Sequence, residues 1–409
     1  MGEQDTAGLP KIVLDLVVDL LIQCRDPLPF VVEQEKPRND GLVFRNLSLV
    51  HRSWISSARR GLWSRAIVDA SDLNSYPQSA EHCSHLRELA FEENENESPE
   101  HDAWDQLAQV LQRSPNLKIL YLDLDVPHDN FSVFLAQLRL QTSLETLWLS
   151  GDAEKDYNDL LLTVPALDSL KSLVIDCSDE EGVNTDSLSV LHSPVNLKAV
   201  AFTESVDWGF LPFLVKPNAK HSVTDLHLEL DDEYLEMSPE LKACLNSLLS
   251  LRISTSGTDA ETELSIQKLL LNTIFSEVQS LQHLSLSVGP VLRTSELVLP
   301  INIRSFHIHH ECFAASACHA QLMLENDANI ASVILDASSR FTKEDSIQRI
   351  TLSFMGSSEE FERSMQEGLT KIFAKTQDAC KQANITLVFR TYPSLYFAEL
   401  AESPVFAGF

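Results

Sequence analysis

Glycine is scarce in this chain of 409 residues, with only 12 copies. Phosphate-binding loops of nucleotide-dependent enzymes need glycine where the backbone approaches the phosphates, and none of their spacing patterns occurs in this sequence. The Gly-x-Ser-x-Gly motif of hydrolases and the His-Glu-x-x-His motif of zinc proteases are also missing. The sequence marks out no catalytic site, so we expect a non-catalytic protein without a cofactor.

The chain also lacks several signatures of secreted and membrane proteins. Its seven cysteines are odd in number and scattered, with no Cys-x-x-Cys pair, which predicts reduced thiols in the cytoplasm or nucleus. Residues 1–8 are polar and lack the basic start of a secretory signal. No apolar run approaches the length of about 18 residues that predicts a membrane span, so we expect none.

Basic residues are few relative to acidic ones, with 31 Lys and Arg against 60 Asp and Glu, a net charge of −29. Residues 1–70 hold nine of each sign, so the excess negative charge lies entirely in the remainder of the chain. An acidic surface repels phosphate groups, which argues against a nucleic-acid partner. It favours a basic protein partner instead.

A unit of the form Leu-x-x-Leu-x-Leu recurs from residue 86 almost to the end of the chain, about every 26 residues. The units begin at Leu86, Leu117, Leu144, Leu170, Leu197, Val223, Leu248, Leu281, Ile303, Ile330 and Ile347, with a fainter copy at Ile385. A fixed period in this range predicts a solenoid. Stacked repeats build extended surfaces, which favours a binding function.

Positions 1, 4 and 6 of the repeat are apolar in every full unit. Their alternation predicts a short strand with positions 4 and 6 in the core and positions 5 and 7 on the opposite face. Helix-like segments lie between most strands, for example at 102–113, 130–140 and 186–192. We therefore expect an α/β leucine-rich-repeat solenoid with a parallel concave sheet and outer helices, which resembles the ribonuclease-inhibitor-like superfamily. The unit at Ile330 fits less well, because the next begins only 17 residues later.

The segment 9–22 is apolar nearly all round, with Asp15 and Asp19 on one narrow stripe. A helix of this kind must bury more than one face. Too few residues precede the repeats to form a large core of their own. The helix therefore needs a partner protein or docking onto the solenoid, and a simple capping helix is the alternative.

A second resemblance is carried by residues in two N-terminal stretches. They are Leu9, Pro10, Leu14 and Val17, followed by Leu49, Val50, Arg52, Trp54, Leu62 and Trp63. This set resembles an F-box and is similar in particular to the F-box proteins common in fungi, in which the module precedes irregular leucine-rich repeats. Two features depart from the family pattern, namely Lys11 in place of an acidic residue and an insert at residues 27–40.

The resemblance implies three parts: an F-box-like helical module at 1–70, the repeats at 71–390, and a tail or cap at 391–409. An F-box joins its protein to the adaptor subunit of an SCF-type ubiquitin ligase, and through it to a cullin. The adaptor-binding residues that the resemblance implies are Leu9, Pro10, Leu14, Val17, Leu21, Leu49, Val50 and Trp54.

The repeats of such a receptor would hold the target protein on strand positions 5 and 7. Tyr and Trp beside carboxylates resemble a binding hot spot for a basic segment. Our candidate substrate-binding residues are Tyr121, Asp123, Trp148, Asp176, His227 and Arg252. An alternative for Trp148 is burial under a loop or against the F-box.

Two further hypotheses remain. His307, His309, His310, Cys312, Cys318 and His319 form a cluster worth testing for metal, although its spacing is not that of a structural zinc site, and we assign no metal ligands. The alternative to a ligase receptor is a leucine-rich-repeat scaffold or assembly protein whose N-terminal helices serve only as a cap.

Overall fold

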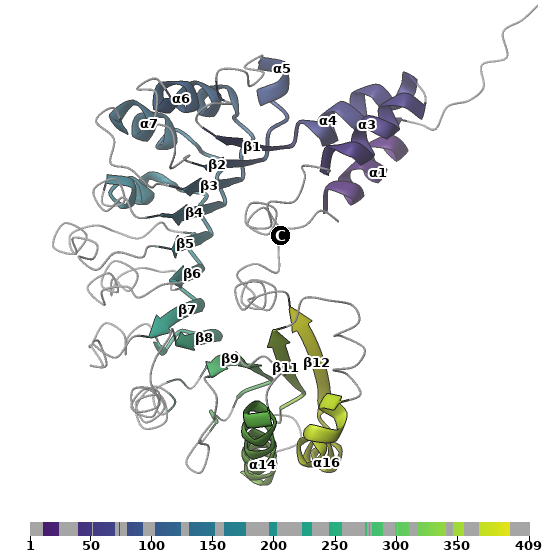
Figure 1. Cartoon of the computed structure of the whole chain (residues 1–409). Helices are drawn as coiled ribbons and strands as arrows, with labels where there is room; N and C mark the ends of the chain where they lie inside the picture. Colours follow the sequence, from purple (N-terminus) through teal and green to yellow (C-terminus); the bar gives the residue numbers. More distant parts are fainter. Residues whose placement is uncertain are drawn as a thin grey trace, which may run out of the picture. The chain divides into compact units, whose positions relative to one another are not determined.

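The computed structural model describes part of the chain, in ranges that lie between residues 11 and 392 (Figure 1). By their internal contacts the residues form two compact units, Met1–Glu181 and Gly182–Gly408, which we call unit 1 and unit 2. Among the described residues, no helix combines the length and apolar character needed to cross a membrane. The described ranges are 11–23, 40–50, 52–69, 73, 80–92, 103–123, 131–151, 159–176, 196–202, 223–230, 245–255, 275, 278, 280–288, 299–300, 302–310, 317–340, 347–355 and 368–392.

Unit 1 begins with helices and continues with strands that alternate with helices. Its helices are α1 (Lys11–Gln23), α3 (Asp40–Val50), η1 (Arg52–Trp54), α4 (Ile55–Leu62), α5 (Ala80–Cys83), α6 (Ala103–Arg113), α7 (Phe131–Leu138) and η2 (Val164–Ala166). Its strands are β1 (Arg65–Asp69), β2 (Glu88–Glu92), β3 (Ile119–Asp123), β4 (Thr146–Ser150) and β5 (Ser172–Asp176). Neighbouring strands from β1 to β5 pair in parallel and in chain order.

Unit 2 is also built from strands and helices. Its strands are β6 (Ala199–Phe202), β7 (Asp225–Leu230), β8 (Ser250–Thr255), β9 (His283–Val288), β10 (Ser305–His310), β11 (Arg349–Met355) and β12 (Thr386–Tyr392), and its helices are α14 (Ala317–Arg340) and α16 (Ala374–Ala383). These strands also pair in parallel and in chain order. The helices α14 and α16 pack against each other (Figure 1).

The repeat pattern is confirmed in the strands from β2 to β11, because each begins two residues after position 1 of a predicted unit. The register places equal positions side by side, so that Leu120 is opposite Leu147 and Leu147 opposite Leu173. The N–H groups of Lys118 and Ile119 both donate to the Arg87 carbonyl, at 2.8 and 3.0 Å, and most later repeats use the same backbone pair. Buried leucines and a recurring backbone contact therefore define a leucine-rich-repeat-like sheet.

The unit predicted at Ile330 is wrong, because these residues belong to the 24-residue helix α14. Ile330, Val333, Ile334 and Ala337 are buried, whereas Leu335, which the strand prediction placed in the core, is 41% exposed. Spacings of three and four residues are those of one face of a helix. The chain therefore runs from β10 through α14 to β11, without the strand predicted at Ile330.

The sheet begins earlier than the repeat pattern predicts. Trp63 occupies position 1 of an additional unit, with Ala66 and Val68 at the buried positions 4 and 6 of β1. The Ser64 carbonyl accepts the N–H groups of Arg87 and Glu88, which is the backbone pair of the later repeats. Helix α4 therefore leads directly into the sheet.

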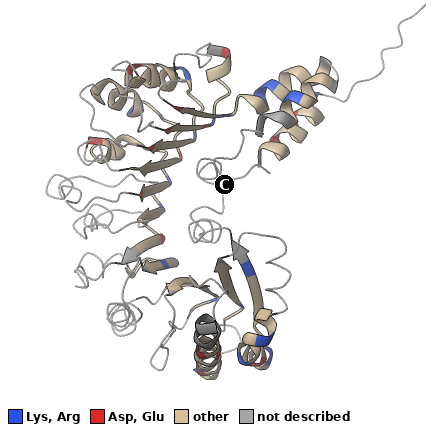
Figure 2. Cartoon of the chain, viewed as in Figure 1, with Lys and Arg blue, Asp and Glu red and all other residues tan. Residues whose placement is uncertain are grey.

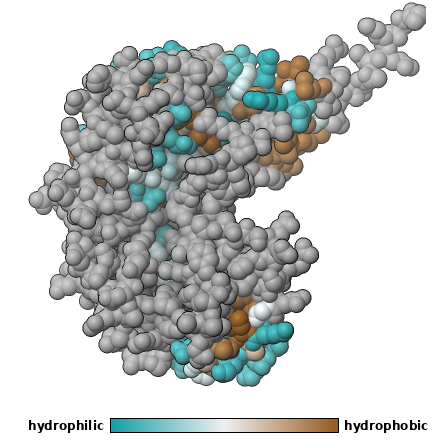
Figure 3. Space-filling view, viewed as in Figure 1, coloured by the Kyte–Doolittle hydropathy of each residue, from teal (hydrophilic) through white to brown (hydrophobic). Residues whose placement is uncertain are grey.

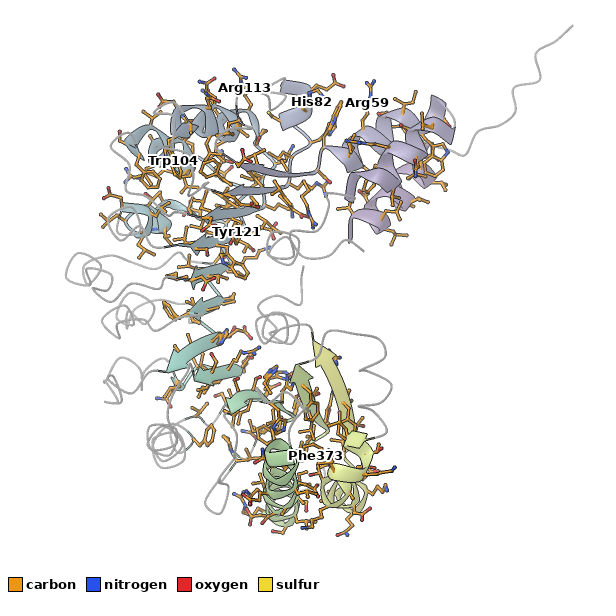
Figure 4. All side chains as sticks on the ribbon, in the orientation of Figure 1. Arg59, His82, Trp104, Arg113, Tyr121 and Phe373 are labelled. Atoms are coloured by element: carbon orange, nitrogen blue, oxygen red, sulfur yellow. The ribbon has the colours of Figure 1, made fainter. Side chains whose placement is uncertain are left out.

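Aromatic packing holds the helices of unit 1 against the strands. Trp104 of α6 is 2% exposed, and its ring lies 5.1 Å from that of Phe91, 4.8 Å from Phe131 and 5.0 Å from Phe134. Figure 4 shows Trp104 on the α6 side of the strands and Tyr121 on the other side. Helices α6 and α7 confirm the segments predicted at 102–113 and 130–140, whereas the segment at 186–192 lies outside the described residues.

Candidate protein-binding surfaces

Helices α1, α3 and α4 form a small core of their own. Leu14 and Val18 of α1, Phe44 of α3 and Ala58 of α4 are each at most 2% exposed. A Cβ atom on Gly61 would lie 2.3 Å from the Phe44 ring, so the absence of a side chain allows α3 and α4 to approach closely. The core thus uses one face of α1.

A polar contact fixes α1 on α4. The Arg60 guanidinium lies 3.0 Å from an Asp19 carboxylate oxygen and 3.6 Å from one of Asp15, and it donates to the Asp15 carbonyl at 3.0 Å. The Ser57 hydroxyl donates to the Asp15 carboxylate at 2.7 Å. The acidic stripe of α1 therefore faces α4.

The rest of α1 presents apolar side chains to solvent. Ile12, Leu16 and Leu20, which we call the α1 stripe, are 70%, 57% and 59% exposed. Their spacing of four residues places them on one helix face. Val43 and Leu49 of α3 add further exposed apolar area, at 48% and 82%. Figure 3 shows hydrophobic surface on this helical module. Exposed apolar groups gathered on one face of a helix are typical of protein-binding surfaces.

The predicted adaptor-binding residues fall into different environments. Leu49 is exposed, Val17, Leu21 and Trp54 are half-buried, and Leu14 is 1% exposed in the module's own core. Leu14 therefore stabilises the module and is not available to a partner. Leu9 and Pro10 lie outside the described residues, and Val50 is the last residue of α3. The structure adds the α1 stripe, whose regular four-residue spacing in the sequence was the signal that could have found it.

The junction between the module and the repeats is built from Trp63 and its neighbours. The Trp63 ring meets that of His82 edge-on at 3.7 Å and lies 6.0 Å from that of His85. The Arg59 guanidinium lies 5.7 Å from the Trp63 ring, which is a cation–π distance. Figure 4 shows Arg59 and His82 at this junction. The module and the first repeat are therefore joined by packed side chains.

The sheet face of unit 1 differs from the predicted hot spot in exposure. Tyr121 and Trp148 stand opposite each other on β3 and β4, with ring centroids 5.8 Å apart, and are only 5% and 2% exposed. Neighbouring strands lie close enough for such rings to pack against each other. Asp123 and Asp176 are half-buried at position 7, and the Ser150 hydroxyl lies 3.5 Å from an Asp176 carboxylate oxygen. The carboxylates, and not the aromatic rings, are the accessible part of this face.

The two candidate residues of unit 2 are buried polar groups. His227 is 1% exposed, with Nε2 3.1 Å from the Ser254 hydroxyl. Burial, and secondly the charge of Arg252, hold the pKa of His227 well below its usual value. Arg252 is 3% exposed and donates to Nε2 of His309 at 3.2 Å. Both residues therefore belong to buried polar pairs on strands of unit 2.

The histidines of β10 are engaged in hydrogen bonds and ring contacts. His310 stacks on Phe354, with ring centroids 5.0 Å apart, and burial lowers its pKa to about 4. In the part of the chain that the structure describes, no group of three His, Cys, Asp or Glu side chains is placed to hold a metal ion. Cys312 of the predicted cluster lies outside that part.

Comparison with known proteins finds likenesses among solved structures but none in sequence. No protein-family model matches the chain, and no curated protein matches it. A solved structure, the crystal structure of the Rad7 and Elc1 complex in yeast, matches with 15% identity over 84% of this chain and 87% of that chain, at a TM-score of 0.37. A likeness at this TM-score supports no functional argument.

Proposed function

We propose that this chain is a non-catalytic substrate receptor of an SCF-type ubiquitin ligase. The helical module would bind the adaptor subunit, and through it a cullin, while the repeats hold the target protein. A receptor of this kind acts by keeping the target at high effective concentration near the recruited enzyme. We propose the cytoplasm or nucleus as its location. Among the described residues, Cys83 and Cys380 are buried thiols that form no disulfide.

The observation that carries the adaptor assignment is the division of α1 into two apolar faces. One face buries Leu14 and Val18 in the module's core, and the α1 stripe on the other stays exposed. Burying an exposed leucine side chain contributes about 1.5–3 kcal/mol. A surface with several such residues favours association with an apolar protein groove over a role as a simple cap, and so supports the receptor over the scaffold alternative.

We propose that the target protein binds unit 1 through a basic segment. The position 7 side chains Asp69, Glu92, Asp123 and Asp176 are half-buried carboxylates at the carboxyl ends of parallel strands. Parallel neighbours lie about 4.8 Å apart, so this row of carboxylates matches Lys or Arg side chains along an extended segment. The net charge of −29 favours the same partner at long range.

Replacing both Leu16 and Leu20 with glutamate tests the adaptor-binding surface. The double variant is expected to lose adaptor co-purification by at least 100-fold, because two charges would have to be buried in an apolar contact. The module should remain folded, since both side chains are already exposed. Pull-down of the co-expressed adaptor, quantified against the receptor band, measures the effect.

The matched control is Leu140→Glu, because Leu140 is 67% exposed beyond α7 and lies outside the helical module. It should bind the adaptor like the wild type. Equal co-purification by the double variant and the control would remove the α1 stripe from the proposed function. Circular dichroism on both proteins excludes unfolding as the cause of a loss.

A further inference from the structure

From β7 onward, one face of the sheet in unit 2 carries polar side chains where the strands of unit 1 carry mostly apolar ones, and β6 still has Ala201 there. At position 5, β2 to β5 hold Ala90, Tyr121, Trp148 and Val174. At the same position, β7 to β11 hold His227, Arg252, Ser285, His307 and Thr351. The fold therefore does not require polar groups at this position. Burying guanidinium and imidazole groups costs free energy, so their concentration in unit 2 points to a ligand and not to sheet stability.

Six polar residues on this face, at position 5 and at neighbouring positions, form what we call the donor cluster. They are Arg252 of β8, His307 and His309 of β10, Arg349 and Ser353 of β11, and Arg390 of β12. The strand register places His309 opposite Ser353 and Ser353 opposite Arg390, so all members except Arg252 lie on the three adjacent strands β10, β11 and β12. Arg252 of β8 joins them through its contact with His309. In Figure 2 the basic position within β12 is visible on its ribbon.

The hydrogen bonds of the cluster have one direction. Arginine can only donate, so His309 Nε2 accepts from Arg252 at 3.2 Å. The same Nε2 also lies 3.0 Å from the Ser285 hydroxyl. The neutral His309 ring then carries its proton on Nδ1, which donates to the Ser353 hydroxyl at 2.6 Å. Ser353 donates in turn to His307 Nε2 at 3.0 Å.

This direction fixes what the cluster can present to a ligand. Because His307 accepts at Nε2, its own proton is on Nδ1. The series of hydrogen bonds from Arg252 to His307 therefore has a donor at each end, the Arg252 guanidinium at one and His307 Nδ1 at the other. Burial, followed by the charges of Arg252, Arg390 and Arg349, holds the pKa of His307 well below its usual value, so each of the three guanidinium groups lies within electrostatic range of this ring. A group that only accepts hydrogen bonds and carries negative charge is complementary to this arrangement.

We propose that the donor cluster binds a phosphate group, either free or carried as a monoester on a larger molecule. A phosphate offers several acceptor oxygens and about two negative charges, which suits three guanidinium groups better than a single carboxylate does. Arg349 and Arg390 are half-buried, whereas Arg252, His309 and Ser353 are at most 3% exposed. The ligand therefore approaches from the β11 and β12 side. The inference is independent of the proposed ligase role.

Isothermal titration calorimetry on the full chain with inorganic phosphate and with O-phosphoserine tests the site. Saturable binding is expected, and Arg349→Gln and Arg390→Gln should each weaken it at least tenfold. The matched control is Arg304→Gln, because Arg304 is exposed at position 2, just before β10. It removes the same charge near the sheet and should change the affinity less than twofold. Tighter binding of O-phosphoserine indicates a phosphate carried on a larger molecule, and equal binding indicates a free anion.

A second measurement covers the case in which a variant is unstable. Phosphate should raise the urea midpoint of the wild-type protein above that in sodium chloride of the same ionic strength, because a ligand of the folded state stabilises it. The proposal is overturned if neither phosphate compound binds saturably and the midpoint stays the same. It is equally overturned if Arg304→Gln weakens binding as much as the two cluster variants do.

Discussion

Lowering the pH from 7.5 to 5 is expected to destabilise unit 2 strongly. Burial holds the pKa of His227, His307, His309 and His310 below that of an unfolded histidine. A buried neutral histidine stabilises the folded state fully above pH 6.5, and this contribution is lost as the pH falls towards the folded-state pKa, because the unfolded chain takes up the proton first. For His310, with a pKa of about 4, the loss at pH 5 is about 2 kcal/mol. The other three histidines shift stability in the same direction.

His310 offers a matched variant for this prediction. It stacks on Phe354 and lies 5.7 Å from the tilted Phe373 ring, and among the described residues its Nε2 atom has no hydrogen-bond partner. His310→Leu removes both the titrating group and the buried polar atom at similar volume. The free energy of unfolding, measured by urea denaturation, should fall between pH 7.5 and 5 by about 2 kcal/mol less in this variant than in the wild type. Identical pH dependence of the two proteins would show that His310 is charged or solvated in the folded state.

Truncating Trp104 to alanine is expected to lower the free energy of unfolding of unit 1 by about 3–5 kcal/mol. The ring contacts three phenylalanines, from β2 and α7, so its removal leaves a cavity between the helices and the sheet. The ring contacts are edge-on, which is a favourable aromatic geometry beyond the buried area. Urea denaturation followed by circular dichroism measures the loss.

The control for Trp104 is Val133→Ala on α7. Val133 is 48% exposed, although it is next to the buried Phe134. A change within about 0.5 kcal/mol is expected at such a surface position. A loss below 1 kcal/mol for Trp104→Ala would mean that α6 and α7 are not held by this aromatic group.

The sequence predicts the strands well because the same pattern of apolar positions recurs in each repeat. Buried positions 1, 4 and 6 recur with every strand from β2 to β11. The same rule failed at Ile330, where apolar residues three and four apart also satisfy a helix, and periodicity in a short window does not separate the two. It also missed β1, because Ala66 is small and Trp63 had been assigned to the helical module alone.

The binding surfaces were less predictable because exposure depends on tertiary contacts. Leu14 and Leu16 are the same residue type on the same helix, yet only Leu14 is in the core. The ion pairs of Asp15 and Asp19 with Arg60 of α4 orient α1 in this way. Trp148 faces away from the helices as predicted for position 5, but its burial follows from neighbours that the repeat pattern does not specify. The sequence places His307 and His309 on one strand face, whereas their link to Arg252 through Ser353 needed coordinates.

The most direct test of the receptor assignment is co-expression of the full chain with the SCF adaptor, followed by size-exclusion chromatography with light scattering. We predict a stable complex with one adaptor per chain, which the Leu16→Glu and Leu20→Glu double variant does not form. A truncation is a poorer test, because removing residues 1–68 would also delete most of β1 and expose the edge of β2. Well-folded receptor that elutes free of adaptor would contradict the account and favour a scaffold with capping helices.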